Sequence, residues 1–338
     1  MTTNLKLRNA YLSITEKCDH SCKFCYASDG FGLGEFKDAD IDTIKKIIDE
    51  ISKFKVENIF IVGGNPVLHT EITEVLEYIK EHTDMRTILM TNTAYFPNNS
   101  IEEMSKYIDC VATTIHGQDS KSHDKICNVD GAYVDLIRNL KLFQKENIAI
   151  EVAYNIAPYS FDSIFVSIKS LMEKGLDLSR ILLQRIAPTS ETKLNEEYAV
   201  NAKQVNVALA QMDKARKELN VEIELVDPFP LCFVEKQFWH LITPCKCGVC
   251  DLAINGQGDA SRCPADPTYE MGNILETPIN ELWTNAKELC DFRNNAHLPE
   301  ECKMCADKDI CRGGCVISCN MYNSLKRSHL DMFRKKVV

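Results

Sequence analysis

Three cysteines near the start of the chain could bind an iron–sulfur cluster. Cys18, Cys22 and Cys25 follow one another with the spacing C-x3-C-x2-C, and the aromatic Phe24 stands just before the third cysteine. Three thiolates on one tight loop can hold three irons of a [4Fe–4S] cube and leave the fourth iron open. An iron with an open site can bind and reduce a small molecule, so this spacing predicts redox chemistry on a bound ligand.

A zinc site is the alternative interpretation of the same cysteines. Structural zinc sites usually take four ligands and use C-x2-C pairs. The loop has three cysteines and no nearby fourth, although His20 lies inside it and could complete the set. The ligand count therefore favours an iron–sulfur cluster over zinc.

A second set of cysteines lies in the last third of the chain. Cys302, Cys305, Cys311 and Cys315 have the spacing C-x2-C-x5-C-x3-C. At this cysteine content, a given cysteine would begin that pattern by chance about once in 10⁴. Zinc ribbons also use C-x2-C units, but they need two close pairs. Since 11 of the 16 cysteines lie beyond Val226, this part of the chain is expected to bind metal.

Composition restricts the class of protein. The 338 residues are 45% hydrophobic, which is enough for a large domain and a smaller one. The net charge of −10 argues against a general nucleic-acid binder. The start of the chain has no apolar segment typical of a signal peptide, and no apolar run is long enough to cross a membrane. A cytoplasmic protein is expected, in which many cysteines indicate metal or redox chemistry rather than disulfides.

The first half of the chain alternates short apolar runs with amphipathic stretches, which predicts a parallel sheet with right-handed crossovers. A long helix over 194–219 and a short strand over 221–226 follow. Pro228 and Pro230 then mark a boundary, because prolines oppose helix and weaken strand pairing. We therefore expect one domain over 1–226 and another over 227–338. The predicted strands are 10–15, 58–62, 86–91, 110–115, 149–155 and 180–185, and the predicted helices are 41–54, 71–81, 101–107, 133–146 and 163–174.

The first cysteine run resembles the signature of the radical S-adenosylmethionine (SAM) superfamily. In the tail, Cys247 is followed by ten residues, Gly258, four residues and Cys263, and this pattern with the later cysteines resembles the family's SPASM extension. The resemblance implies an α/β fold, a partial (β/α)6 TIM-like barrel followed by a small Cys-rich SPASM domain. It also implies that the open iron chelates SAM, which splits to a 5′-deoxyadenosyl radical that removes hydrogen from a C–H bond.

Several strand ends supply predicted SAM contacts. Gly63-Gly64-Asn65-Pro66 resembles the family's Gly-Gly-Glu-Pro motif, whose backbone binds the SAM amino group, although Asn65 replaces the glutamate. A guanidinium binds a carboxylate through two hydrogen bonds, so Arg185 would suit the SAM carboxylate. The strand ends that carry Asn155 and Arg185 could equally be ordinary solvated ends. The other predicted SAM contacts are Asn92, Thr114, His116 and Asn155.

The SPASM resemblance assigns the tail cysteines to one or two auxiliary [4Fe–4S] clusters. It places Cys247, Cys263 and Cys315 on the first, with Cys245 or Cys250 as fourth ligand. It places Cys302, Cys305 and Cys311 on the second. The usual last cysteine of that cluster is missing, and Cys319 is the candidate for it. Cys110, Cys127 and Cys290 fit no pattern, so we interpret them as packing residues.

SPASM relatives mostly modify peptides, so the resemblance implies a radical SAM maturase that crosslinks a ribosomally made peptide through a thioether or C–C bond. An epimerase is the alternative, with the spare thiol Cys232 as hydrogen donor. Anaerobic sulfatase maturases carry an aspartate after the Gly-x4-Cys, where this chain has Pro264. A haem-pathway enzyme and a non-catalytic iron–sulfur electron carrier are further alternatives, but a carrier has no need of an open iron.

The expected partners follow from the same resemblance. They are a precursor peptide and an electron donor such as flavodoxin or ferredoxin. The chain begins almost at its first strand, so a separate protein or the barrel rim is expected to bind any leader peptide. Nucleic acid and membrane are not expected as partners.

Overall fold

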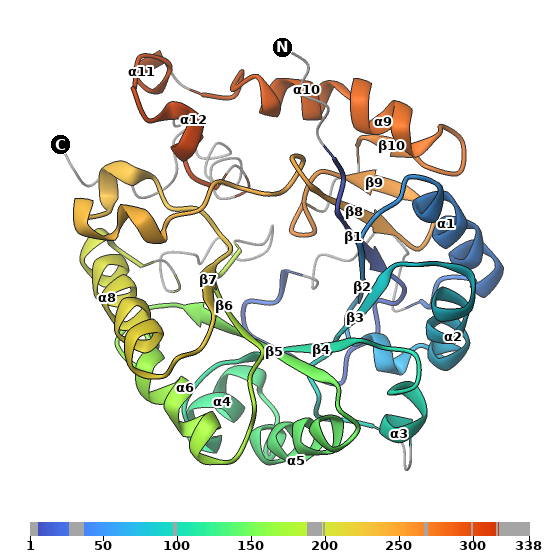
Figure 1. Cartoon of the computed structure of the whole chain (residues 1–338), viewed down its shortest axis with the longest axis horizontal. Helices are drawn as coiled ribbons and strands as arrows, with labels where there is room; N and C mark the ends of the chain where they lie inside the picture. The colour runs from blue at the N-terminus through green and yellow to red at the C-terminus, as the bar shows by residue number, and fades with distance from the viewer. Residues whose placement is uncertain are drawn as a thin grey trace.

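The structure is a computed structural model that describes residues 6–26, 37–96, 100–187, 198, 200–266, 270–298, 300–315 and 317. Within these ranges the chain forms an open ring of strands with helices around it (Figure 1). None of the helices in these ranges is long and apolar enough to cross a membrane.

Seven parallel strands form most of the ring, each paired with the next along the chain. The expected partial barrel is confirmed, and its six predicted strands lie at or near their predicted positions. The strand predicted over 221–226 joins the same sheet beside the sixth. The strands are β1 (Asn9–Ser13), β2 (Asn58–Val62), β3 (Arg86–Met90), β4 (Cys110–Ile115), β5 (Ala149–Ile156), β6 (Arg180–Arg185) and β7 (Ile223–Leu225).

Amphipathic helices pack on the outside of the ring (Figure 1). The helix between β1 and β2 is typical, because Ile44, Ile47, Ile48 and Ile51 are buried at helical spacing. The sequence did not indicate the helix over 120–127, which is short and mostly polar. The helices are α1 (Ile41–Lys53), α2 (Ile72–His82), α3 (Ser100–Met104), α4 (Ser120–Cys127), α5 (Ala132–Lys145), α6 (Ile164–Glu173) and α8 (Ala202–Glu218).

The Cys-rich tail extends the same sheet. Strand β8 (Asp251–Asn255) pairs in parallel with β1, and β9 (Asp259–Ser261) and β10 (Gly272–Asn273) follow it. The ten-stranded order β10-β9-β8-β1-β2-β3-β4-β5-β6-β7 leaves β7 and β8 unpaired with each other in the described part. The domain boundary near Val226 stays a prediction. The remaining elements are η3 (Leu231–Phe233), η4 (Lys236–Leu241), α9 (Ile279–Asn285), α10 (Lys287–Arg293), α11 (Glu300–Lys303) and α12 (Lys308–Cys311).

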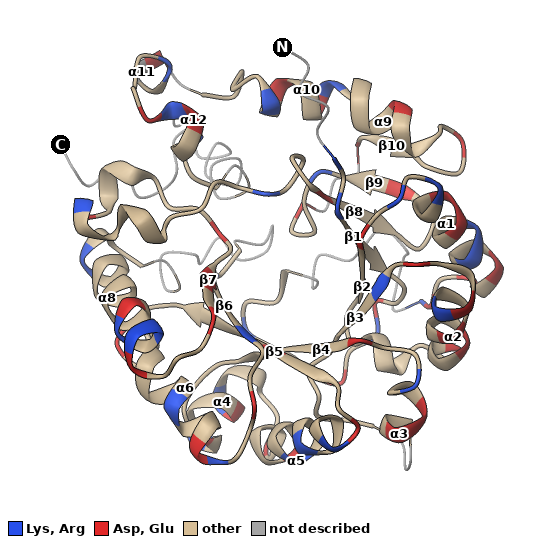
Figure 2. Ribbon diagram, in the orientation of Figure 1, with Lys and Arg blue, Asp and Glu red and all other residues tan. Residues whose placement is uncertain are grey.

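The two faces of the strands are buried against different surroundings. Ile59 and Ile61 of β2 pack outward in the large core under the helices, whereas Phe60 and Val62 belong to a small apolar cluster on the other face. Side chains alternate across a strand, so this second face lines the inside of the ring. Most of the charged residues lie on the outer helices (Figure 2). Because one face of the strands packs under the helices and the other packs inside the ring, we expect the candidate site at the carboxyl ends of the strands.

Candidate functional site

The three N-terminal cysteines lie on the loop after β1, at the carboxyl edge of the sheet. Cys18 is exposed, and Cys22 and Cys25 are half-buried. The end of α4 anchors this loop, because the Ser21 N–H donates to the Cys127 carbonyl at 3.3 Å. The Lys23 N–H donates to the Ile126 carbonyl at 3.4 Å. The last carbonyls of a helix lack partners within it, and here they hold the cluster loop.

The glycine turn after β2 presses against the base of the same loop. The Gly64 N–H donates to the Thr15 carbonyl at 2.9 Å, and the Asn65 N–H donates to the Lys17 carbonyl at 2.6 Å. A Cβ on Gly64 would lie 2.3 Å from the Lys17 oxygen, so no larger residue fits there. Pro66 then starts the short helical turn η2 (Pro66–Leu68). The structure thus explains the glycine by its contact with the loop, while the contact of this turn with SAM stays a prediction.

A hydrogen-bond network joins the buried Asn65 to the exposed Asp19 of the cluster loop. Asn65 is fully buried, and its Nδ2 donates to Asp19 Oδ1 at 2.9 Å. Asn92 Nδ2 donates to the same carboxylate oxygen at 2.7 Å, and Thr91 Oγ1 donates to Asn65 Oδ1 at 2.8 Å. Asp19 was not among the predicted site residues, although it stands inside the cysteine run. A glutamate at position 65 would bring a second carboxylate toward Asp19, so the departure from the family motif has a local reason.

Three of the predicted SAM contacts share the inner face at the ends of β4 and β5. Thr114 continues the inner-facing series of Cys110 and Ala112 and is half-buried. His116 follows two residues later, and Asn155 Nδ2 lies 3.3 Å from its Nδ1. Burial lowers the pKa of His116 well below its usual range, so the ring is neutral near pH 7.

Strand β6 brings Gln184, rather than Arg185, into this group. Gln184 Nε2 donates to Asn155 Oδ1 at 2.8 Å. The Arg185 side chain takes the opposite side of the strand, where Nη1 donates to the Pro228 carbonyl at 3.1 Å and the guanidinium lies over Phe229. Gln184 was not among the predicted contacts, because strand alternation puts Gln184 and Arg185 on opposite faces but does not say which of them faces inward. The role predicted for Arg185 in binding SAM stays a prediction, and its position favours a role beside the tail.

A pocket of about 530 Å³ opens beside the cluster loop. Three lysines line it, Lys23 from the loop and Lys121 and Lys125 from α4, and among the described lining residues Asp119 is the acidic one. An aromatic contact connects it to the cysteine run, because the ring centroids of Tyr198 and Phe24 lie 5.6 Å apart. The pocket can accept a polar ligand with negative charge. Its other lining residues are Ser122, Ile126, Pro158, Tyr159 and Tyr198.

Two of the cluster-loop thiols, those of Cys18 and Cys22, are protonated in the metal-free chain. Burial raises the pKa of Cys18 to about 11. The pKa of Cys22 is also raised, first by a hydrogen bond with Cys127 and then by burial. Metal must displace these protons, because the thiolate is the ligand.

Four tail cysteines gather beside Asp227, which follows β7, and Arg262, which follows β9. Cys247 hydrogen-bonds both Cys245 and Cys263, and these contacts raise the Cys247 pKa well above its usual range. Burial raises the pKa of Cys315 to about 12, with Cys245 and Cys263 among its charged neighbours and Arg185 opposing the shift. The structure therefore places Cys245 with the three cysteines predicted for the first auxiliary cluster.

Cys250 points away from that group. Its thiol lies 3.3 Å from Asp251 Oδ1, and Lys246 and Arg8 are its other charged neighbours. Of the two candidates for fourth ligand, the geometry favours Cys245. Gly258, which precedes Cys263 in the pattern, has a φ of +93°, a conformation that glycine adopts readily.

The remaining tail cysteines lie on the last described helices. Cys302 is in α11, Cys305 follows it, and Cys311 ends α12. The Leu231 N–H donates to Cys311 Sγ at 3.4 Å, so the neighbouring Cys232 lies near this set and is exposed. That position favours Cys232 as a cluster ligand over a hydrogen donor. Cys319 lies outside the described residues.

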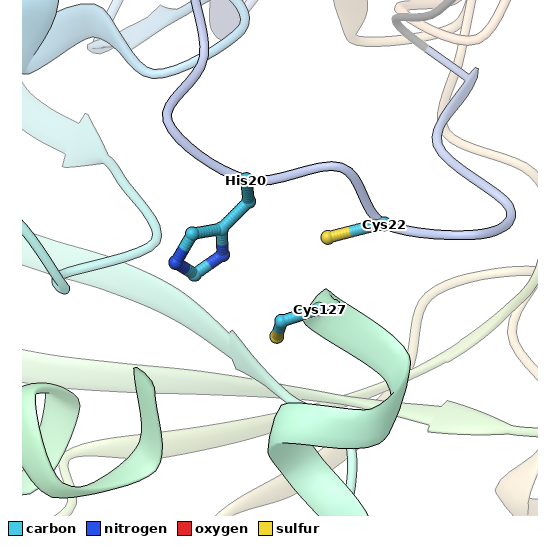
Figure 3. A group of neighbouring side chains, drawn as sticks. All are labelled: His20, Cys22 and Cys127. Atoms are coloured by element: carbon cyan, nitrogen blue, oxygen red, sulfur yellow. The ribbon is translucent and has the colours of Figure 1, made fainter. Parts of the chain in front are cut away.

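Cys127 stands out among the cysteines that fit no pattern. It ends α4, is buried, and lies against the cluster loop beside His20 and Cys22 (Figure 3). The expectation that it is only a packing residue is therefore incomplete. Cys110 is buried in β4, and the Cys290 thiol contacts the Thr284 carbonyl, which agrees with the packing interpretation.

The chain was compared with known protein families. Residues 12–163 match the family described as the radical SAM superfamily, and residues 245–306 match SPASM, described as an iron–sulfur cluster-binding domain. The chain belongs to the radical SAM superfamily. It is a radical SAM enzyme with a SPASM domain.

Relatives of this radical SAM enzyme cover most of its length. An AdoMet-dependent heme synthase of Methanosarcina barkeri is 19% identical over 89% of this chain and 88% of its own. A PqqA peptide cyclase of Granulibacter bethesdensis is 20% identical over 89% of this chain and 80% of its own. At these identities, the relatives leave the substrate open.

Solved structures of similar fold include two SAM-bound enzymes. Streptococcus suis SuiB bound to S-adenosylmethionine has a TM-score of 0.77 and 17% identity, covering 98% of this chain and 78% of its own. Native anSMEcpe with bound AdoMet and a peptide has a TM-score of 0.69 and 16% identity, covering 93% of this chain and 90% of its own. These likenesses support the fold of the radical SAM enzyme.

The residues fit the groups that the family binds. Cys18, Cys22 and Cys25 lie on one anchored loop at the ring's carboxyl edge, beside the polar ends of β4 and β5. This loop offers thiols that suit the radical SAM cluster and a polar surface that suits SAM, and the SPASM region offers a separate cysteine group that suits an auxiliary cluster. The role of each residue stays a prediction.

Proposed function

We propose that this radical SAM enzyme modifies a ribosomally made peptide and forms a thioether or C–C crosslink in it. When bound, SAM and the first cluster supply the 5′-deoxyadenosyl radical that takes a hydrogen atom from the peptide. The chain must then bind the peptide, exclude water and remove a second electron.

The gathering of Cys245, Cys247, Cys263 and Cys315 is the observation that carries this proposal. A cluster with four thiolates has no open iron, so it can transfer electrons but offers no place for a substrate atom. A crosslink removes two hydrogens from the peptide, one as an atom and one as a proton and an electron. An auxiliary cluster at these cysteines would accept the electron that leaves the peptide. An external donor such as flavodoxin or ferredoxin would supply the electron for SAM cleavage.

The second auxiliary cluster remains part of the proposal. Cys302, Cys305 and Cys311 would supply three ligands, and Cys319 or Cys232 the fourth. The contact of Leu231 with Cys311 supports Cys232 for that place, which weakens the case for an epimerase with Cys232 as hydrogen donor.

A peptide substrate agrees with the pocket at the cluster loop. Lys23, Lys121 and Lys125 give it an excess of positive charge, so we infer that the peptide carries acidic side chains. A PqqA peptide cyclase is among the relatives, and SuiB bound to its precursor peptide SuiA has a TM-score of 0.74 to this chain.

A haem-pathway activity is the second candidate. Relatives named as AdoMet-dependent heme synthases align over 89% of the chain, and the lysines of the pocket would also suit a substrate with several carboxylates. The sulfatase maturase alternative has less support, because Pro264 stands where those enzymes carry an aspartate.

The experiment uses the reconstituted enzyme, a reductant, SAM and candidate precursor peptides that carry acidic side chains, in D2O. A crosslinked product should be two hydrogens lighter and carry no deuterium at carbon. An epimerised product would have one deuterium and otherwise unchanged mass. A deuterated isomer, or turnover of a tetrapyrrole with none of the peptide, would contradict the proposal.

A further inference from the structure

We propose that, before its first cluster is assembled, the chain binds one thiophilic divalent cation such as Zn²⁺ through His20, Cys22 and Cys127. A ring nitrogen of His20 and the two sulfur atoms all lie within 4.8 Å of one another (Figure 3). Zinc binds sulfur at about 2.3 Å and imidazole nitrogen at about 2.1 Å, which puts its ligand atoms about 3.5–4 Å apart. Small side-chain rotations would bring these three atoms to that spacing.

The backbone already holds these ligands together without a metal. His20 and Cys22 come from the cluster loop, whereas Cys127 is the last residue of α4. Between His20 and Cys22, the Ser21 N–H donates to the Cys127 carbonyl, and Asn128 Nδ2 donates to Ser21 Oγ at 3.0 Å. These hydrogen bonds fix the loop to the helix end next to the residues that would bind the cation.

A buried histidine supports Cys127 from behind. The His116 backbone N–H donates to His123 Nδ1 at 3.2 Å, which leaves the His123 ring proton on Nε2. This Nε2 lies 3.2 Å from Cys127 Sγ, so its N–H points at the sulfur. Hydrogen bonds of this kind orient a metal ligand and stabilise the thiolate that a cation needs.

His20 gives an independent sign of an unfilled site. Its Nε2 is buried and has no hydrogen-bond partner in the part of the chain that the structure describes. A buried polar atom without a hydrogen-bond partner destabilises the fold. A bound cation would give one of the two ring nitrogens a partner after rotation of the imidazole.

Cys22 belongs to both metal sites, so the cation and the first cluster exclude each other. Cys18 and Cys25 belong to the predicted cluster alone, and His20 and Cys127 to the cation site alone. The cation would therefore protect Cys22 and hold the loop in the metal-free chain, and it would have to leave before the cluster is built.

The test measures zinc bound by the full-length metal-free chain, under anaerobic conditions and in competition with a chromogenic chelator. The tail cysteines also bind zinc, so the informative quantity is the difference between variants. Cys127→Ser and His20→Gln should each hold one equivalent less tightly bound zinc than the unmodified chain. Cys110→Ser, a buried cysteine in β4, and Cys18→Ala should hold as much as the unmodified chain.

Replacing zinc with Co²⁺ identifies the side chains that bind the cation, because the absorption spectrum of Co²⁺ depends on its ligands. The difference spectrum between the unmodified chain and Cys127→Ser should show tetrahedral Co²⁺ with two thiolates. Circular dichroism checks folding, and His20→Gln, on the loop, keeps the test valid if Cys127→Ser unfolds.

Equal zinc binding by His20→Gln and the unmodified chain would overturn the proposal, as would an equal loss in Cys18→Ala. Neither SAM nor peptide is present in this test, so its outcome is independent of the proposed crosslinking.

Discussion

At the scale of single residues, the fully buried amide of Asn65 connects two strand ends to the cluster loop. It donates to Asp19 and accepts from Thr91, so both of its functional atoms are used. Sequence comparison alone shows only that an asparagine replaces a glutamate. The structure supplies the reason, which is the carboxylate of Asp19 beside it.

Asn65→Asp should therefore destabilise the cluster loop. The change places a buried carboxylate against Asp19, which should lower the free energy of unfolding by about 3 kcal/mol. Urea unfolding of the metal-free chain measures this loss, and iron content after reconstitution reports the first cluster. Adding Asp19→Asn should recover much of both. A double variant no better than Asn65→Asp would show that the two side chains do not act on each other.

His116 should make stability depend on pH. Its pKa in the folded chain lies well below the usual value of about 6.5, first because of burial. The unfolded chain thus binds more protons, and stability falls as pH drops below about 6.5. His123 acts in the same direction, because burial lowers its pKa to about 4.

Urea unfolding of the metal-free chain at pH 7.5 and pH 5.5 checks this expectation. The free energy of unfolding should be lower at pH 5.5, and the difference should be smaller in His116→Gln, by up to about 1.4 kcal/mol per pH unit. Identical differences in the two proteins would rule His116 out as a source.

At the scale of elements, the sequence indicates the strands of the ring because their apolar runs are unbroken and punctuated by turns. It does not indicate α4, whose polar residues are held by a local capping box of Asp119 and Ser122. At the end of β6 it indicates Arg185 as a candidate, whereas Gln184 is the side chain that contacts Asn155. Which way a strand end points depends on pairing with its neighbours, and a single sequence contains no direct record of that.

The glycine turn is the element on which the cluster loop rests. Gly64→Ala should displace the loop, because the new Cβ would lie 2.3 Å from the Lys17 oxygen and 2.7 Å from the Glu16 oxygen. Iron content and SAM cleavage should both fall at least tenfold.

Gly175→Ala is the matched control. Its site has φ of +84° but open space around the new Cβ, so it should cost roughly 1–2 kcal/mol of stability and leave the first cluster intact. Equal cluster content in both variants would mean that the loop does not need the close contact with the turn.

At the scale of the whole molecule, the ring and the Cys-rich tail share one sheet through β1 and β8. The tail also crosses the gap between β7 and β8, where Thr243 Oγ1 donates to the Leu225 carbonyl at 2.6 Å. The sequence patterns indicated which cysteines could share a cluster, but not whether Cys245 or Cys250 completes the first auxiliary set. That choice depends on how residues 245–250 turn before β8.

Cys245→Ala and Cys250→Ala form a matched pair for this choice. Cys245→Ala should lose or alter one auxiliary cluster and lower peptide modification more than SAM cleavage, because an electron acceptor is removed. Cys250→Ala should keep the iron content and the spectrum. Electron paramagnetic resonance of the reduced proteins distinguishes them, and the reverse pattern would reassign the fourth ligand.

The most direct measurement is 5′-deoxyadenosine formation by the reconstituted chain in which Cys18, Cys22 and Cys25 are all changed to alanine. This variant should lose one cluster and all SAM cleavage while its auxiliary clusters remain. The control Cys110→Ala should retain the first cluster and SAM cleavage. If the triple variant still forms 5′-deoxyadenosine, the cluster that cleaves SAM lies elsewhere and the account of this site is contradicted.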